Sequence, residues 1–305
     1  MKTLLLGIFG VLLLNVGATQ AATFSEGDDA FRRGDYAMAY SIMRTLATRG
    51  DARAQANLGM LYRNGQGASK NYLEALEWYR LAAEQGDVNG QVGLGYGYET
   101  GQGIAQNHTE ALKWYRLAAH QGNVHAQVNL GTLYRDGRGV AQNHATALTW
   151  YRLAASQGNA VAQYNLGIAY EDGQGLAPDH TEAAKWYRLA AAHGDPDAQN
   201  NLGALYDKGR GVERNSVEAL KLYRLAAAHG SAAGQNNLGV MYANGWSVAQ
   251  DDVRALMWFT IGTYSGDTNA LQNHVVAAKS MTPQQIAEAR KMTKDCLDKR
   301  LTGCD

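Results

Sequence analysis

The chain has 305 residues, of which 46% are hydrophobic, and it carries 28 basic and 28 acidic side chains. The apolar content is ample for a packed interior, and the balanced charge leaves no net field to attract nucleic acid or an anionic membrane. We therefore expect no nucleic-acid partner.

The N-terminus has the pattern of an export signal. Lys2 precedes an apolar run at residues 4–14, which is shorter than the roughly 20 residues that a membrane-spanning helix needs. Small residues at 19–21 predict cleavage after Ala21, and residues 16–18 offer a second site. We predict a signal peptide at residues 1–21 and an exported protein, periplasmic or secreted, that does not insert in a membrane after cleavage. The alternative is an uncleaved anchor helix.

Residues 22–50 have the pattern of a shortened helix pair with only Gly34 and Asp35 as its turn, and we expect this pair to form an N-terminal cap. Residues 51–266 contain a 36-residue period, in which Leu-Gly begins at Leu58, Leu94, Leu130, Leu166, Leu202 and Leu238. A period between about 20 and 50 residues is the signature of a solenoid. A single copy cannot bury its own apolar face, so the six copies must stack.

Each copy has the start and stop signals of two helices. The first helix follows a capping residue such as Asp51 and ends at a glycine such as Gly65. The second opens with a capping box such as Asn71-x-x-Glu74. Gly59 and its equivalents lie beside the buried stripe of the first helix, which suggests that a neighbouring backbone comes too close there for a side chain.

Residues 267–305 are predicted to form C-terminal capping helices, since a terminal copy needs a lid with a polar outer face. Thr282 and Gln285 flank Pro283 in the pattern of a second helix start. Cys296 and Cys304 predict a disulfide that pins the C-terminus of an exported chain. The C-x-x-C spacing of redox-active pairs is absent.

The repeated pattern resembles a known family. A-Q-x-N-L-G-x-x-Y-x-x-G-x-G followed by A-x-x-W-Y-R-L-A-A-x-x-G is similar to the Sel-1-like repeats, a branch of the tetratricopeptide-like helical repeats. Copies five and six depart from it most, at Leu222 and at residues 258–263. The resemblance implies an all-α, right-handed α-solenoid of antiparallel helix pairs, with six repeats plus terminal caps. It also implies that the first helices line a concave face.

No catalytic or metal motif stands out. His108, His144 and His180 recur in successive copies, but copies about 10 Å apart are too distant for their imidazoles to share a metal. The motifs G-x-S-x-G, S-x-x-K and H-E-x-x-H are absent, and the glycine pairs lie between helices, where they indicate turns. We predict no catalytic residue, no metal and no cofactor.

Gln55 and Asn57 recur in nearly every copy. Such recurrence suggests that they satisfy backbone groups between copies. The alternative, which stays open here, is a ladder of asparagine amides that hydrogen-bonds a bound chain, as similar positions do in tetratricopeptide grooves.

Positions that vary between copies map, by resemblance, onto the groove. They offer an apolar floor in the middle copies and charges that alternate along the rim, which suits a peptide with an apolar anchor and mixed charges. The competing interpretation is that they are ordinary surface residues. The predicted ligand-binding residues are Met60, Arg63, Val92, Tyr96, Glu99, Val128, Thr132, Arg135, Tyr164, Ile168 and Glu171, together with Asn129 and Asn165.

The sequence therefore predicts a monomeric, non-enzymatic scaffold or adaptor that binds a protein or peptide, in cell-envelope regulation or host interaction. One alternative is a peptidoglycan or glycan binder in which tyrosines stack on sugar rings. Another is an envelope hydrolase.

Overall fold

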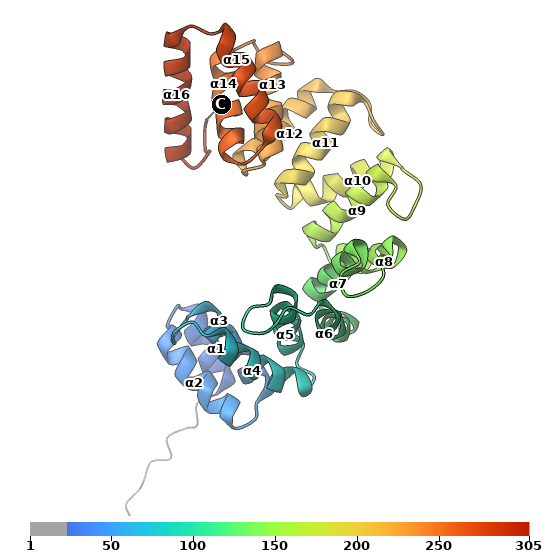
Figure 1. The fold of residues 1–305 in the computed structure, drawn as a ribbon, viewed down its shortest axis with the longest axis vertical. Coiled ribbons are helices and arrows are strands. Elements are labelled where there is room, and N and C mark those ends of the chain that lie inside the picture. The colour runs from blue at the N-terminus through green and yellow to red at the C-terminus, as the bar shows by residue number, and fades with distance from the viewer. Residues whose placement is uncertain (1–22, 305) are drawn as a thin grey trace, which may run out of the picture. The chain divides into compact units, whose positions relative to one another are not determined.

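The computed structural model describes residues 23–304, so the predicted signal peptide lies outside the described residues. Over this range the chain forms sixteen helices and no strand (Figure 1). It divides between Gly90 and Gln91 into two compact units. Each unit is described by itself.

In the first unit each helix packs against the next along the chain. The helices are α1 (Phe24–Arg32), α2 (Tyr36–Thr48), α3 (Ala52–Asn64) and α4 (Tyr72–Glu84). The short turn between α1 and α2 contains Gly34 and Asp35, as expected. Met43 of α2 shares an apolar core with Leu58 and Leu61 of α3, so the N-terminal pair covers the first copy.

Ten residues of α5 and the eleven helices after it belong to the second unit. These are α5 (Val88–Thr100), α6 (His108–His120), α7 (Val124–Asp136), α8 (His144–Ser156), α9 (Ala160–Asp172), α10 (His180–Ala192), α11 (Pro196–Lys208), α12 (Ser216–Ala228), α13 (Ala232–Asn244), α14 (Asp252–Tyr264), α15 (Thr268–Ser280) and α16 (Pro283–Asp298). One apolar cluster joins Leu148 and Tyr151 of α8 to Leu166 of the next copy. Copies therefore bury each other's apolar faces, and the all-α repeat solenoid is confirmed.

Helix ends agree with the predicted signals, with one difference. Asp51 accepts a hydrogen bond from the Ala54 amide (2.9 Å), and Gly65 closes α3 in the left-handed conformation (φ 71°). At the start of α6, however, Glu110 lies 3.5 Å from Lys113, one turn along the helix. The Asn107 backbone N–H, which would make the return bond of a capping box, donates to the Tyr98 carbonyl (2.8 Å). The Asn71 N–H donates to the Tyr62 carbonyl (3.0 Å) in the same way, so the predicted box at Asn71 and Glu74 is wrong. Within residues 23–304, reciprocal boxes occur at the starts of α1 and α16.

The helical glycines make room chiefly for an aromatic ring, and at Gly59 a neighbouring backbone comes close as well: a Cβ there would lie 2.8 Å from the Tyr79 ring and 3.0 Å from the Ala75 carbonyl oxygen. A Cβ on Gly167 would lie 2.4 Å from the ring of Tyr187, on the second helix of the same copy. Gly131 faces Tyr151 in the same way, at 2.7 Å. The close contact is therefore made within a copy, between its two helices.

The recurring glutamine ties helices together. Gln127 is 4% exposed; its amide donates to the Ala119 carbonyl (3.3 Å), and its side-chain oxygen accepts from Gln157 (2.9 Å). Gln55 makes the equivalent bond to the Ala47 carbonyl (3.2 Å). These contacts support the structural interpretation of the recurring glutamine.

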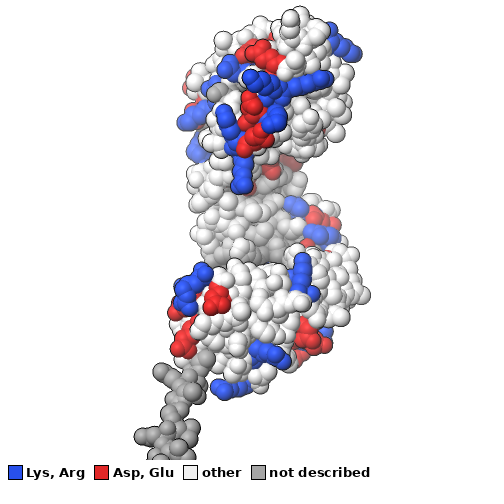
Figure 2. Space-filling model, turned by 90° about the vertical axis from the view of Figure 1, so that its left-hand side faces the viewer, with Lys and Arg blue, Asp and Glu red and all other residues white. Residues whose placement is uncertain are grey.

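The C-terminal helices do not form another regular pair. α16 packs against α14, and its outer face carries interspersed acidic and basic side chains (Figure 2). In contrast, α15 exposes Leu271, Val275 and Val276, the last at 67%. The polar outer face expected of the C-terminal lid is therefore present on α16 but not on α15. The predicted disulfide between Cys296 and Cys304 is confirmed, with Cα atoms 5.2 Å apart.

Loss of this disulfide is expected to destabilise the C-terminal end. Cross-linking residues eight apart removes chain entropy from the unfolded state worth about 2.5 kcal/mol. Cys304→Ser should lower the protection of α16 amides against hydrogen exchange by that amount, and reduction of the wild type should do the same. Unchanged protection in both samples would contradict the prediction.

Candidate functional site: the A-helix face

The predicted groove residues lie on the first helices of copies one to four. We define the A-helix face as the side chains at three variable positions of the odd-numbered first helices of all six copies. In the second unit α9 contacts α11, α11 contacts α13 and α13 contacts α15, so these helices form a row. The face comprises Ala56, Met60 and Arg63 in the first unit, and Val92, Tyr96, Glu99, Val128, Thr132, Arg135, Tyr164, Ile168, Glu171, Asn200, Ala204, Asp207, Asn236, Val240 and Ala243 in the second.

Most predicted residues are half-buried. Met60 and Arg63 are half-buried in the first unit. In the second unit Tyr96 is 36% exposed, whereas Val128 is 9% exposed. The ring of Tyr164 lies 5.9 Å from that of Tyr187, and burial raises the pKa of Tyr164 to about 12. The face thus combines accessible and packed side chains.

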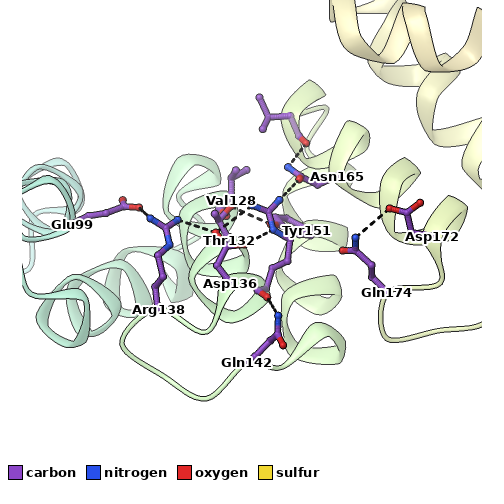
Figure 3. Close-up of polar contacts among 12 residues, drawn as sticks. Glu99, Val128, Thr132, Asp136, Arg138, Gln142, Tyr151, Asn165, Asp172 and Gln174 are labelled. Atoms are coloured by element: carbon purple, nitrogen blue, oxygen red, sulfur yellow. Dashed lines mark hydrogen bonds and ion pairs between the residues drawn. The ribbon is translucent and has the colours of Figure 1, made fainter. Parts of the chain in front are cut away.

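Charged side chains of the middle copies bind polar or charged groups of the neighbouring copy (Figure 3). Glu99 accepts a hydrogen bond from the Tyr115 hydroxyl (2.8 Å) and lies 3.3 Å from Arg138 of the next copy. Arg135 donates to the Asn165 side-chain oxygen (2.8 Å), again in the next copy, and to Asp136. The rim charges therefore help to hold adjacent copies in register.

A chain of side-chain hydrogen bonds continues this network toward the C-terminus. Glu171 accepts from the Tyr187 hydroxyl (2.7 Å), which accepts from Asn201 (3.3 Å). Five asparagines then connect α11, α13 and α15 through bonds of 2.8–3.4 Å: Asn201, Asn200, Asn237, Asn236 and Asn273. Earlier in the row, Asn165 donates to the Val161 carbonyl (2.8 Å), and Asn129 lies within hydrogen-bonding reach of Tyr115. These amides contribute to the fold whether or not they also contact a ligand.

Asp136 gives a pH-dependent prediction. Burial opposes ionisation of its carboxyl, but the hydrogen bond and charge of Arg135 and the charge of Arg138 outweigh it, so the pKa is lowered. A lowered folded-state pKa stabilises the protein above the unfolded value, about 3.9, and this stabilisation is lost as the pH falls through the folded pKa. Asp136→Asn should therefore be less stable than wild type at pH 7, by less than about 1 kcal/mol because the site is partly exposed. Urea unfolding should show that difference closing below about pH 4; a constant difference would contradict it.

A cavity lies at the C-terminal end of the row, among residues outside the predicted set. Its volume is about 340 Å³, and it is lined by Val240, Ala243, Asn244, Asp252, Ala255, Phe259, Asn273, Val276, Ala277 and Ser280. Val240 and Ala243 occupy variable positions of copy six. The signal that could have found them is the change from a charge to alanine at position 243, beside the apolar Val240.

Metal ligands and membrane-spanning helices are two further features that could indicate function. Within residues 23–304, no three His, Cys, Asp or Glu side chains come together as metal ligands. Over the same range, no helix combines the length and the apolar character needed to cross a membrane.

Comparisons with known proteins agree with this architecture. The family model "Sel1 repeat" matches residues 52–87, 88–123, 124–159, 160–195, 196–231 and 232–267. The crystal structure of a Sel1 repeat protein from Oxalobacter formigenes is 33% identical, with a TM-score of 0.74, and the match covers 78% of this chain and 96% of that one.

Two further solved structures match with lower scores. One is a protective antigen of uropathogenic Escherichia coli with an SLR fold (24% identity, TM-score 0.37, 92% of this chain and 84% of that one). The other is an immunity protein of Pseudomonas aeruginosa (22% identity, TM-score 0.45, 70% and 89%). No curated protein matches the chain. Sel1 repeats generally form non-enzymatic scaffolds for protein–protein interaction, and the six matched copies show that this chain belongs to the Sel1 repeat family.

Proposed function

We propose that the protein is an exported scaffold that binds a protein or peptide segment along the A-helix face of its second unit. The observation that carries the proposal is the cavity of about 340 Å³, because its Val240 and Ala243 continue the row of predicted groove positions. Buried apolar anchors supply most of the affinity of such interfaces. A partner segment would place one apolar side chain in this cavity and extend along the row toward Tyr96.

The charge pattern of the face adds to this proposal. Glu99 and Arg135 are engaged by side chains of their own chain, so a partner would have to replace existing bonds to gain theirs. The amides of Asn244 and Asn273, on the cavity wall, are likewise engaged, by the Val240 carbonyl (2.9 Å) and by the Asn236 side-chain oxygen (2.8 Å), whereas an apolar side chain that enters the cavity has no such bond to replace. We therefore propose that an apolar anchor, rather than complementary charge, determines which segment binds.

A peptide selection tests the proposed face. A random dodecapeptide library would be selected on residues 23–305, and the recovered peptides measured against variants by fluorescence polarisation. Val276→Asp, in the cavity wall, and Tyr96→Ala combined with Tyr164→Ala should each weaken binding at least tenfold. The matched control is Leu153→Asp, which changes an exposed leucine of the second helix α8. Equal loss in the control, or no loss in the groove variants, would contradict the proposal.

Export is the second part of the proposal. The apolar run at residues 4–14 and the disulfide at the C-terminus support it, since disulfides persist mainly in oxidising compartments. Expression of the whole chain in a Gram-negative host, followed by fractionation, should yield a periplasmic or secreted monomer that begins at Ala22. An intact N-terminus on cytoplasmic protein would contradict export.

A further inference from the structure

A second cavity lies where the disulfide-bonded C-terminal loop covers the second helices. Its volume is about 370 Å³, within the range of small-molecule sites, about 300–1,000 Å³. It is lined by Lys221, Arg224, Leu225, Ala228, Leu238, Trp258, Leu301, Gly303 and Cys304. None of these residues belongs to the A-helix face.

The C-terminal loop makes the surface around Leu225 different from the equivalent surface of other copies. Leu117, Leu153 and Leu189, which are equivalent to Leu225, are 44–46% exposed on their helices. At Leu225 the chain brings Leu301 and Cys304 to the same cavity, and the disulfide to Cys296 holds that wall in place. The result is an apolar pocket that is partly open to solvent, and Leu225 itself remains 41% exposed.

The polar groups of the cavity favour an anion. Lys221 and Arg224 contribute to the wall, and the described lining residues include no carboxylate. Lys221 lies 3.4 Å from Glu218, and Arg224 donates to the Tyr242 hydroxyl at 3.2 Å. Both cations therefore lie in the wall of an otherwise largely apolar cavity.

The indole of Trp258 is a further feature of the cavity wall. It is 2% exposed, it lines the cavity, and its indole N–H has no hydrogen-bond partner within the described part of the chain. Buried polar groups normally have a partner. Trp114 and Trp186 share the unpartnered N–H, but they are not among the residues that line this loop-covered cavity.

We propose that this cavity binds a small amphipathic carboxylate, with its hydrocarbon body against Trp258, Leu225 and Leu301 and its carboxylate toward Lys221 and Arg224. The disulfide makes the site depend on redox state, because reduction frees the wall that carries Leu301 and Cys304. The ligand class follows from an apolar interior with two cations in its wall.

Calorimetry with straight-chain carboxylates tests the proposal on residues 23–305. Hexanoate, octanoate and decanoate should bind at one site, with affinity rising about threefold to fourfold per added methylene until the cavity is full. Decyltrimethylammonium, which has the same chain with a positive charge, should bind at least tenfold more weakly than decanoate. Several weak, unsaturable events, or equal binding of the cation, would overturn the proposal.

Matched variants locate the site. Lys221→Met combined with Arg224→Met should weaken decanoate binding at least tenfold. Lys185→Met combined with Arg188→Met changes the same positions one copy earlier, where Arg188 makes the same bond to a tyrosine, and should leave binding unchanged. Equal effects of the two pairs would overturn the assignment.

Three further samples test the wall and the apolar surface of Trp258. Cys304→Ser and the reduced wild type should each lose most of the affinity while circular dichroism shows intact helices, and Trp258→Phe should weaken binding several-fold. Asp305 comes after the cavity residues in the sequence and lies outside the described residues. Asp305→Asn should bind decanoate at least as tightly as wild type, and weaker binding would contradict the preference for an anion.

Discussion

Replacing Tyr187 by alanine is expected to lower the free energy of unfolding by about 3–5 kcal/mol, the range for loss of a buried aromatic side chain. Tyr187 is fully buried, its ring fills the space left by Gly167, and its hydroxyl donates to Glu171 (2.7 Å). Tyr187→Phe keeps the ring and removes only the hydroxyl, so it should cost about 1 kcal/mol. Urea unfolding followed by circular dichroism measures both. An alanine variant no worse than the phenylalanine variant would contradict the assigned packing.

Gly167→Ala tests the same packing, because its effect on the free energy of unfolding should be opposite in sign to the effect that helix propensity alone predicts. Alanine is favoured over glycine inside a helix by about 1 kcal/mol, but the new Cβ would lie 2.4 Å from the Tyr187 ring. The variant should therefore be destabilised, by about 1–3 kcal/mol. In the Tyr187→Ala background the ring is gone, so the same substitution should become stabilising. Destabilisation in both backgrounds would show that the ring is not what excludes the side chain.

The sequence predicts the helices well because their signals are local or periodic. Capping residues such as Asp51 and terminal glycines such as Gly65 act within one turn, and the 36-residue period requires stacked copies. The reason for a glycine at position 167 was not predictable in the same way. Its recurrence indicates a close contact, but only the three-dimensional packing identifies Tyr187 as the neighbour.

The candidate site was less predictable, because its properties depend on side chains from different copies. Variation at positions 99 and 135 suggested partner-facing charges, whereas Glu99 meets Arg138 and Arg135 meets Asn165 across copy boundaries. The first pairing depends on Arg138, at a loop position that the repeat pattern leaves free, and the second depends on how closely α7 and α9 approach each other. The cavity beside Val240 likewise depends on how α15 packs, and α15 lies beyond the six matched copies.

The recurring glutamine, which includes Gln55 and Gln127, gives a prediction about stability. Gln127→Leu is expected to lower the free energy of unfolding by about 2–3 kcal/mol, because it removes two bonds at a buried position: the one to the Ala119 carbonyl and the one from Gln157. If the recurring glutamine instead served only a ligand, the leucine variant would be as stable as wild type or more so. Thermal and urea unfolding of the purified variant distinguish these outcomes.

Gln163 is a matched control that the chain itself provides. Its amide donates to the Ala155 carbonyl (3.4 Å), but its buried side-chain oxygen has no partner within the described residues. The position equivalent to Gln157 in the next copy is His193, whose ring binds the Leu189 carbonyl instead. Gln163→Leu therefore removes one bond and an unsatisfied oxygen, so it should cost about 1–2 kcal/mol less than Gln127→Leu. His193→Gln should supply the missing donor and stabilise the protein by about 1 kcal/mol. Equal costs for the two leucine variants, with no gain from His193→Gln, would mean that the bond between these side chains does not join the helices.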